Sequence, residues 1–149
     1  MRTRYLTILL LLLPFLMNAQ EKSNEVQAVV EVIENYFDGY VDRDLDQLQL
    51  AFDTENGAMK VATKTEDGQE QYENVFFKEL IPRWAARAPF SDEVRNNSSL
   101  KILTLDITAD QMAVAKIEMK IGDTIYIDVL SIQKLNQVWK ITNKMFVVE

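Results

Sequence analysis

Alternation of apolar and polar residues between residues 100 and 148 constrains the fold more than any other feature of the sequence. Successive side chains of a β-strand point to opposite faces of the sheet, so alternation predicts strands with one buried face. Turn signals at Ala109-Asp110, Gly122-Asp123 and Asn136-Gln137 separate four expected strands, which span 100–108, 111–121, 124–135 and 138–148. Strands joined by such short turns run antiparallel, so this region predicts an antiparallel meander.

The two-residue turns also set the pairing of neighbouring strands, and the pairing assigns each side chain to a face. Counting from the Asn136-Gln137 turn places Asp128 opposite Met145. On this register the buried face of the last two strands carries Tyr126, Asp128, Leu130, Ile132, Trp139, Ile141, Asn143 and Met145. Asp128 and Asn143 are the conspicuous polar residues on this face, and they are therefore candidate site residues.

Helical periodicity precedes the meander. Apolar residues recur at intervals of three and four in 24–41, 45–52 and 75–88, which predicts three amphipathic helices. Two short strands are expected at 58–62 and 69–72. Helices followed by a meander indicate an α+β fold, with the helices packed in the concave face of a strongly curved antiparallel sheet.

The first residues are typical of a secretory leader. Met1-Arg2-Thr3-Arg4 is basic, residues 5–17 are almost entirely apolar, and Ala19 supplies a small residue at the expected cleavage site. The apolar run is shorter than the roughly 20 residues that span a bilayer. We therefore expect a signal peptide at 1–19, a single domain at 20–149, and a periplasmic or secreted protein without a membrane partner after cleavage.

Two residue types are missing, and their absence excludes several kinds of site. The chain contains no cysteine and no histidine, which excludes disulfides, a cysteine nucleophile and histidine-ligated metal centres. The formal net charge of −7 disfavours nucleic-acid partners and anionic membrane surfaces. We expect neither a metal ion nor a cofactor.

Asp128 is the strongest candidate for a catalytic residue. A carboxyl group among apolar side chains is desolvated, which favours its protonated form and suits it to act as a general acid or hydrogen-bond donor. The alternative is structural, with Asp128 accepting hydrogen bonds from Asn143, a tyrosine hydroxyl or a loop backbone.

The remaining candidates are four aromatic residues and Asn143. Tyr36 and Tyr40 lie one helical turn apart and can direct their hydroxyls into one cavity, as oxyanion donors or as core residues with a polar tip. Tyr126 shares the face of Asp128, Trp84 can line the mouth of a pocket, and Asn143 can orient a ligand.

The opposite face of the last strands is too apolar for a solvated surface. It carries Ile125, Ile127, Val129 and Phe146, and charged residues rim it: Lys116, Glu118, Lys120, Lys140 and Lys144. A rimmed apolar patch of this kind predicts a homodimer formed through the outer face of the sheet.

Three stretches carry a family resemblance. VIENYFDGYV at 32–41, DVLSIQK at 128–134 and WKITNKMF at 139–146 resemble the putative lumazine-binding family. That family belongs to the nuclear-transport-factor-2-like superfamily of cone-shaped α+β folds, which are related to ketosteroid isomerases and polyketide cyclases. Relatives often carry histidine where this chain has Asp53 and Val147, so a histidine-dependent role is not expected here.

Three functions follow from the pattern and the resemblance. The first is an exported domain that binds a small apolar or aromatic molecule. The second is an isomerase, dehydratase or cyclase that uses Asp128 as acid and Tyr36 or Tyr40 as oxyanion donor. The third is a non-catalytic dimeric scaffold. The resemblance does not decide whether the protein is an enzyme, because this type of fold hosts enzymes, binding proteins and scaffolds alike.

Overall fold

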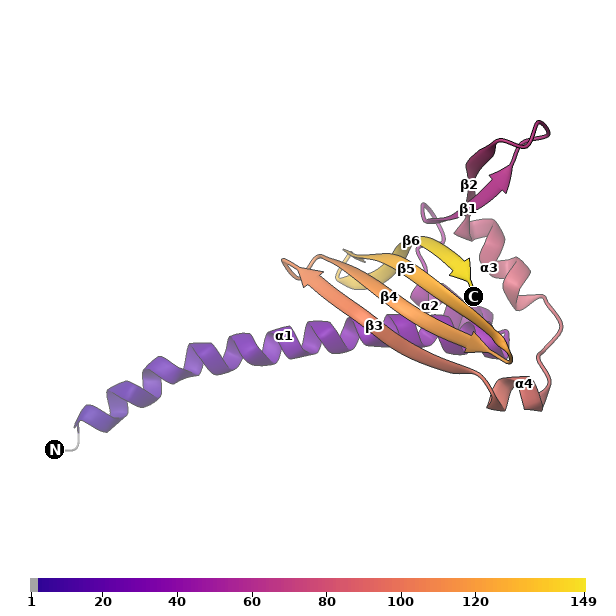
Figure 1. Cartoon of the computed structure of the whole chain (residues 1–149). Helices are drawn as coiled ribbons and strands as arrows, with labels where there is room; N and C mark the ends of the chain where they lie inside the picture. The colour runs from indigo at the N-terminus through magenta and orange to yellow at the C-terminus, as the bar shows by residue number, and fades with distance from the viewer. Residues whose placement is uncertain (1–2) are drawn as a thin grey trace.

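A six-stranded mixed sheet and the helices packed against it form the fold (Figure 1). The computed structural model describes the backbone of residues 3–149 and the side chains of residues 23–149. Met1 and Arg2, the start of the predicted leader, lie outside the described residues. Among the residues that are described, no helix is long and apolar enough to cross a membrane.

The predicted meander is confirmed. Its strands are β3 (Ser99–Thr108), β4 (Met112–Ile121), β5 (Thr124–Leu135) and β6 (Val138–Val148). Leu135 pairs with Val138 across a turn in which Asn136 and Gln137 both have positive φ, the geometry that matches the twist of a two-residue hairpin. The remaining strands, β1 (Ala58–Lys64) and β2 (Glu70–Phe76), form a hairpin that joins the sheet where β1 runs parallel to β6. The strand order is β2-β1-β6-β5-β4-β3.

The helices cover one face of the sheet. They are α1 (Thr3–Asp42), α2 (Leu45–Ala51), α3 (Phe77–Ala85) and the short α4 (Asp92–Asn96). The Asp44 carboxylate caps α2 by accepting hydrogen bonds from the backbone N–H groups of Asp46 and Gln47. The α1 helix is longer than the predicted helix at 24–41, since it begins at Thr3 and passes through Asn24. Its N-terminal part extends beyond the sheet, as Figure 1 shows.

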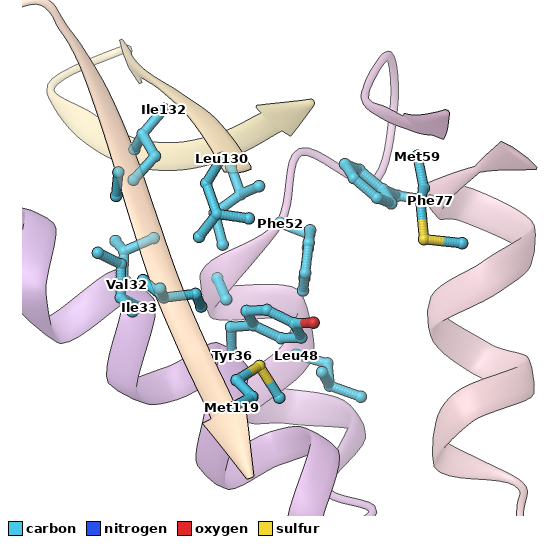
Figure 2. Close-up of a cluster of buried hydrophobic side chains, with 14 of the residues drawn as sticks. Val32, Ile33, Tyr36, Leu48, Phe52, Met59, Phe77, Met119, Leu130 and Ile132 are labelled. Atoms are coloured by element: carbon cyan, nitrogen blue, oxygen red, sulfur yellow. The ribbon is translucent and has the colours of Figure 1, made fainter. Parts of the chain in front are cut away.

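The core lies between α1, α2, α3 and the concave face of the sheet. Figure 2 shows Val32, Ile33 and Tyr36 of α1 close to Met119 of β4 and Leu130 and Ile132 of β5, with Phe52 beside them. All of these side chains are buried. The Gly122-Asp123 turn pairs Ile121 with Thr124, as a two-residue turn requires, so the pairing of β4 with β5 is regular. The inward-facing residues of β4 are also buried: Ala113, Ala115, Ile117, Met119 and Ile121.

One irregularity in β6 overturns part of the predicted register. Ile132 pairs with Ile141 as expected, but Ser131 pairs with Asn143, so Thr142 is an extra residue in β6. A β-bulge of this kind displaces every later side chain by one position, and one position is a change of face. Asp128 therefore lies opposite Phe146 instead of Met145.

Because of the bulge, the last residues of β6 lie on the faces opposite to those predicted. Lys144 is buried and Phe146 lines the concave side, whereas both were predicted on the outer face. Asn143 pairs with Ser131, and Met145 is exposed, whereas both were predicted on the buried face. The predictions of Phe146 in the dimer interface and of Asn143 and Met145 in the core are therefore wrong.

Candidate functional site

A cavity of about 360 Å³ opens between the helices and the sheet. It is lined by Tyr36, Tyr40, Met59, Leu80, Trp84, Arg87, Met119, Tyr126, Lys144, Phe146 and Val148. These residues come from α1, α3, the segment just after α3, and strands β1, β4, β5 and β6. The volume lies at the lower end of the range of small-molecule sites, about 300–1,000 Å³.

Three polar side chains meet at the buried end of this cavity. The Tyr36 hydroxyl donates a hydrogen bond of 2.8 Å to Oδ2 of Asp128, and the Lys144 ammonium forms an ion pair with Oδ1. Asp128 is fully buried, and Lys144 is 3% exposed. Tyr36 and Lys144 line the cavity, whereas Asp128 lies in the second layer of side chains.

Burial determines the acid–base properties of this cluster. It raises the pKa of Tyr36 well above its ordinary value, and the negative charge of Asp128 raises it further. Burial lowers the pKa of Lys144, and the charge and hydrogen bond of Asp128 oppose this change. The tyrosine is therefore a neutral hydroxyl, held by the carboxylate with its proton in the bond to Oδ2.

Aromatic rings form the walls. Trp84 stacks on Tyr36, with ring centroids 6.1 Å apart, and meets Tyr40 edge to face at 5.2 Å. On the sheet side, Tyr126 and Phe146 lie with their centroids 6.3 Å apart. Burial raises the pKa of the Tyr126 hydroxyl. The cavity therefore offers several flat apolar surfaces to an occupant.

The structure brings together four of the six residues predicted for the ligand site. Tyr36, Tyr40, Trp84 and Tyr126 all line the cavity, although they come from three different elements. Asp128 contacts two lining residues from behind. Asn143 does not line the cavity, because the bulge turns it away, and its amide instead donates a 3.1 Å hydrogen bond to the carbonyl of Ala58.

The surroundings of Asp128 are not only apolar, because Tyr36 donates a hydrogen bond to its carboxylate and Lys144 lies against it. The prediction placed Lys144 on the outer face and therefore missed its role. A signal was present in the sequence: Thr142, Asn143 and Lys144 are three consecutive polar residues that interrupt the alternation of the last strand. A bulge within this run exchanges the two faces of the residues that follow it.

The sequence analysis also did not predict Arg87 as a residue of the cavity. It follows the C-terminal end of α3, is exposed, and lines the cavity. Its positive charge partly offsets the increase in the pKa of Tyr126. Nothing in the local sequence pattern distinguishes it from a solvated arginine. No group of three or more Asp or Glu side chains among residues 23–149 is arranged to hold a metal ion.

Comparison with known proteins identifies the family of this chain. The family model described as "Putative lumazine-binding" matches residues 24–147. The chain belongs to this family. A search of curated proteins found no match.

Several solved structures have the same fold as this member of the family. An NTF2-like protein of unknown function from Shewanella baltica superposes with a TM-score of 0.67 at 20% identity, covering 85% of this chain and 95% of the other. A second NTF2-like protein of unknown function, from Methylobacillus flagellatus, gives 0.65 at 18% identity, with 85% and 93% covered. A ketosteroid isomerase-like protein from Erwinia carotovora atroseptica gives 0.57 at 12% identity, with 83% and 95% covered. The predicted cone-shaped α+β fold of the nuclear-transport-factor-2-like superfamily is thereby confirmed.

Proposed function

We propose that this protein binds a small, flat, largely apolar molecule in the cavity between Trp84 and Tyr126. The observation that carries the proposal is a hollow of about 360 Å³ with aromatic walls and one polar cluster at its buried end. Apolar walls with a few convergent polar groups are typical of ligand sites. The description of the family, which names a small molecule as ligand, supports the same function.

A thermal-shift screen with flavin-like, pterin-like and steroid-like compounds tests this proposal. A ligand present at ten times its Kd stabilises the folded state by about 1.4 kcal/mol, which corresponds to a rise in Tm of several degrees. We expect at least one compound to produce such a rise with the wild-type protein.

Two valine substitutions on the same strand localise the binding. Val148 lines the cavity and is 55% exposed, so Val148→Trp narrows the opening without overpacking the core. Val138 is 52% exposed but does not line the cavity, which makes Val138→Trp a matched control. Val148→Trp should reduce the thermal shift and Val138→Trp should preserve it. A screen without any response, or an equal response from both variants, would contradict the proposal.

The geometry gives no support to the alternative in which Asp128 acts as an acid on a substrate. Its two carboxylate oxygens contact Tyr36 and Lys144, and these two side chains separate it from the cavity.

We also propose a homodimer formed through the convex face of the sheet. After correction for the bulge, the central part of this face carries Val114, Ile127, Val129, Met145 and Val147, which we call the outer patch. Val114, Met145 and Val147 are large apolar residues that are each about half exposed. A contiguous apolar patch on a sheet supports association with a second copy.

Met145→Glu tests the dimer, because it introduces a charge next to Val129 in the outer patch. In light scattering we expect a dimer mass for the wild type and a monomer mass for the variant. Leu50→Glu, an exposed position on α2, is the control and should remain dimeric. A monomeric wild type at high protein concentration would rule the dimer out.

Export remains a proposal that rests on the leader pattern of residues 1–19. The intact mass of the protein recovered from periplasm or medium should correspond to a chain that begins at Gln20, and a mass that includes Met1–Ala19 would contradict cleavage.

A further inference from the structure

The Lys144 ammonium has more hydrogen-bond donors than its protein neighbours use. An ammonium group carries three N–H donors. Within the part of the chain whose side chains are described, its one oxygen or nitrogen partner is the Asp128 carboxylate. Its other close neighbours are the faces of two aromatic rings, Phe146 at 4.7 Å and Tyr36 at 5.6 Å from ring centroid to Nζ. Lys144 is only 3% exposed and lines the cavity, and a buried donor normally has a hydrogen-bond acceptor.

The position of Lys144 indicates where that acceptor would lie. Lys144 lines the cavity together with Tyr36, whose ring centroid lies 5.6 Å from its ammonium. Trp84 and Tyr126 line the same cavity, so a ligand between them shares it with the ammonium. A bound ligand can therefore supply an acceptor for Lys144.

The charge balance indicates what kind of acceptor it is. Lys144 and Asp128 form a buried pair with no net charge. An anionic group at this position would leave a net negative charge in the core of a protein whose formal charge is already −7. A neutral oxygen with accessible lone pairs satisfies the ammonium without that cost, and a carbonyl conjugated to a flat ring system also suits the aromatic walls.

We propose that Lys144 donates a hydrogen bond to a carbonyl oxygen of the bound ligand, so that the cavity selects flat conjugated carbonyl compounds over hydrocarbons of the same shape. This inference rests on the proposed function and specifies its ligand class. It makes Lys144 a specificity-determining residue and assigns Asp128 and Tyr36 the role of positioning its ammonium.

A matched pair of probes tests the inference. 2-Acetylnaphthalene and 2-isopropenylnaphthalene have nearly the same shape, and only the first has a carbonyl oxygen. Their Kd values are measured by calorimetric titration of the purified wild-type chain and of a double variant, Asp128→Asn with Lys144→Met, which removes both charges together. The ratio of the two Kd values is compared between proteins, because the different hydrophobicity of the probes cancels in that comparison.

We expect the preference for the acetyl compound to be about tenfold or more greater in the wild type than in the double variant, as a hydrogen bond from a charged donor provides. An equal ratio in both proteins would overturn the role of Lys144 while leaving the proposed function intact. If neither probe binds the wild type, or if Val148→Trp weakens neither, the proposed function and the inference both fail.

The infrared carbonyl band of bound 2-acetylnaphthalene gives a second readout that needs no variant at the polar cluster. A hydrogen bond from an ammonium should place the band at or below its frequency in water. A band at the frequency found in hydrocarbon solvent would overturn the inference, even if the double variant did not fold.

Discussion

Replacing Lys144 with methionine should lower the free energy of unfolding by about 3–5 kcal/mol, which is the usual cost of removing one partner of a buried ion pair. Methionine is unbranched and only one atom shorter than lysine, so most of the loss arises from charge rather than from a cavity. Asp128 is fully buried, and without the ammonium its carboxylate retains a single hydrogen bond, from the Tyr36 hydroxyl. Urea denaturation measures the change.

The double variant Asp128→Asn with Lys144→Met should recover most of that loss, because no buried charge remains and the asparagine carbonyl can still accept from Tyr36. Lys101→Met, at an exposed position on β3, is the control and should change stability by less than about 0.5 kcal/mol. If the double variant is as unstable as the single one, packing rather than charge explains the effect.

Replacing Glu25 with glutamine should lower the free energy of unfolding by about 1–3 kcal/mol at neutral pH, as expected when charge-assisted hydrogen bonds become neutral ones. Glu25 connects α1 to the hairpin formed by β5 and β6. Its carboxylate accepts from the Lys134 ammonium at 2.6 Å and from the Trp139 indole N–H at 2.7 Å. Glu34→Gln, on an exposed position of the same helix, should have little effect.

The Glu25 effect should depend on pH in a defined direction. The hydrogen bond from Lys134, followed by that from Trp139, lowers the pKa of Glu25 in the folded state. A lowered folded pKa contributes stability that is complete above the ordinary glutamate pKa, about 4.3, and is lost as pH falls through the folded value. The difference between wild type and Glu25→Gln should therefore disappear in acid. A difference that persists unchanged below about pH 3 would contradict this assignment.

The buried pair of Lys144 and Asp128 supports a functional interpretation. Pairs of this kind are often no more stabilising than apolar residues of similar volume. The pair lies at the end of a cavity, with unused donors directed toward it, and a ligand site provides a reason for such an arrangement. If stability alone explained the pair, the double variant would bind the acetyl probe as selectively as the wild type.

Turn chemistry and alternation were sufficient to predict most of the sheet. The Asn136-Gln137 turn fixes the pairing as far as Ile132 and Ile141, and the turn at Gly122-Asp123 fixes all of β4 against β5. These predictions succeed because side-chain direction in a regular strand depends only on position along the chain. They fail beyond Thr142, because a single inserted residue exchanges the two faces.

The candidate site was predictable where its residues share one regular element. Tyr36 and Tyr40 lie one turn apart on α1, and both line the cavity. Lys144 was missed because its direction depends on the bulge. Arg87 was missed because its position depends on how the segment after α3 packs against the sheet, which local periodicity does not encode.

The most direct test of this account is a crystal structure of the protein soaked with 2-acetylnaphthalene. We predict that the naphthalene ring lies between Trp84 and Tyr126, with its carbonyl oxygen about 3 Å from Nζ of Lys144. A ring bound outside the cavity, or a ring inside it with its carbonyl directed away from Lys144, would contradict the account.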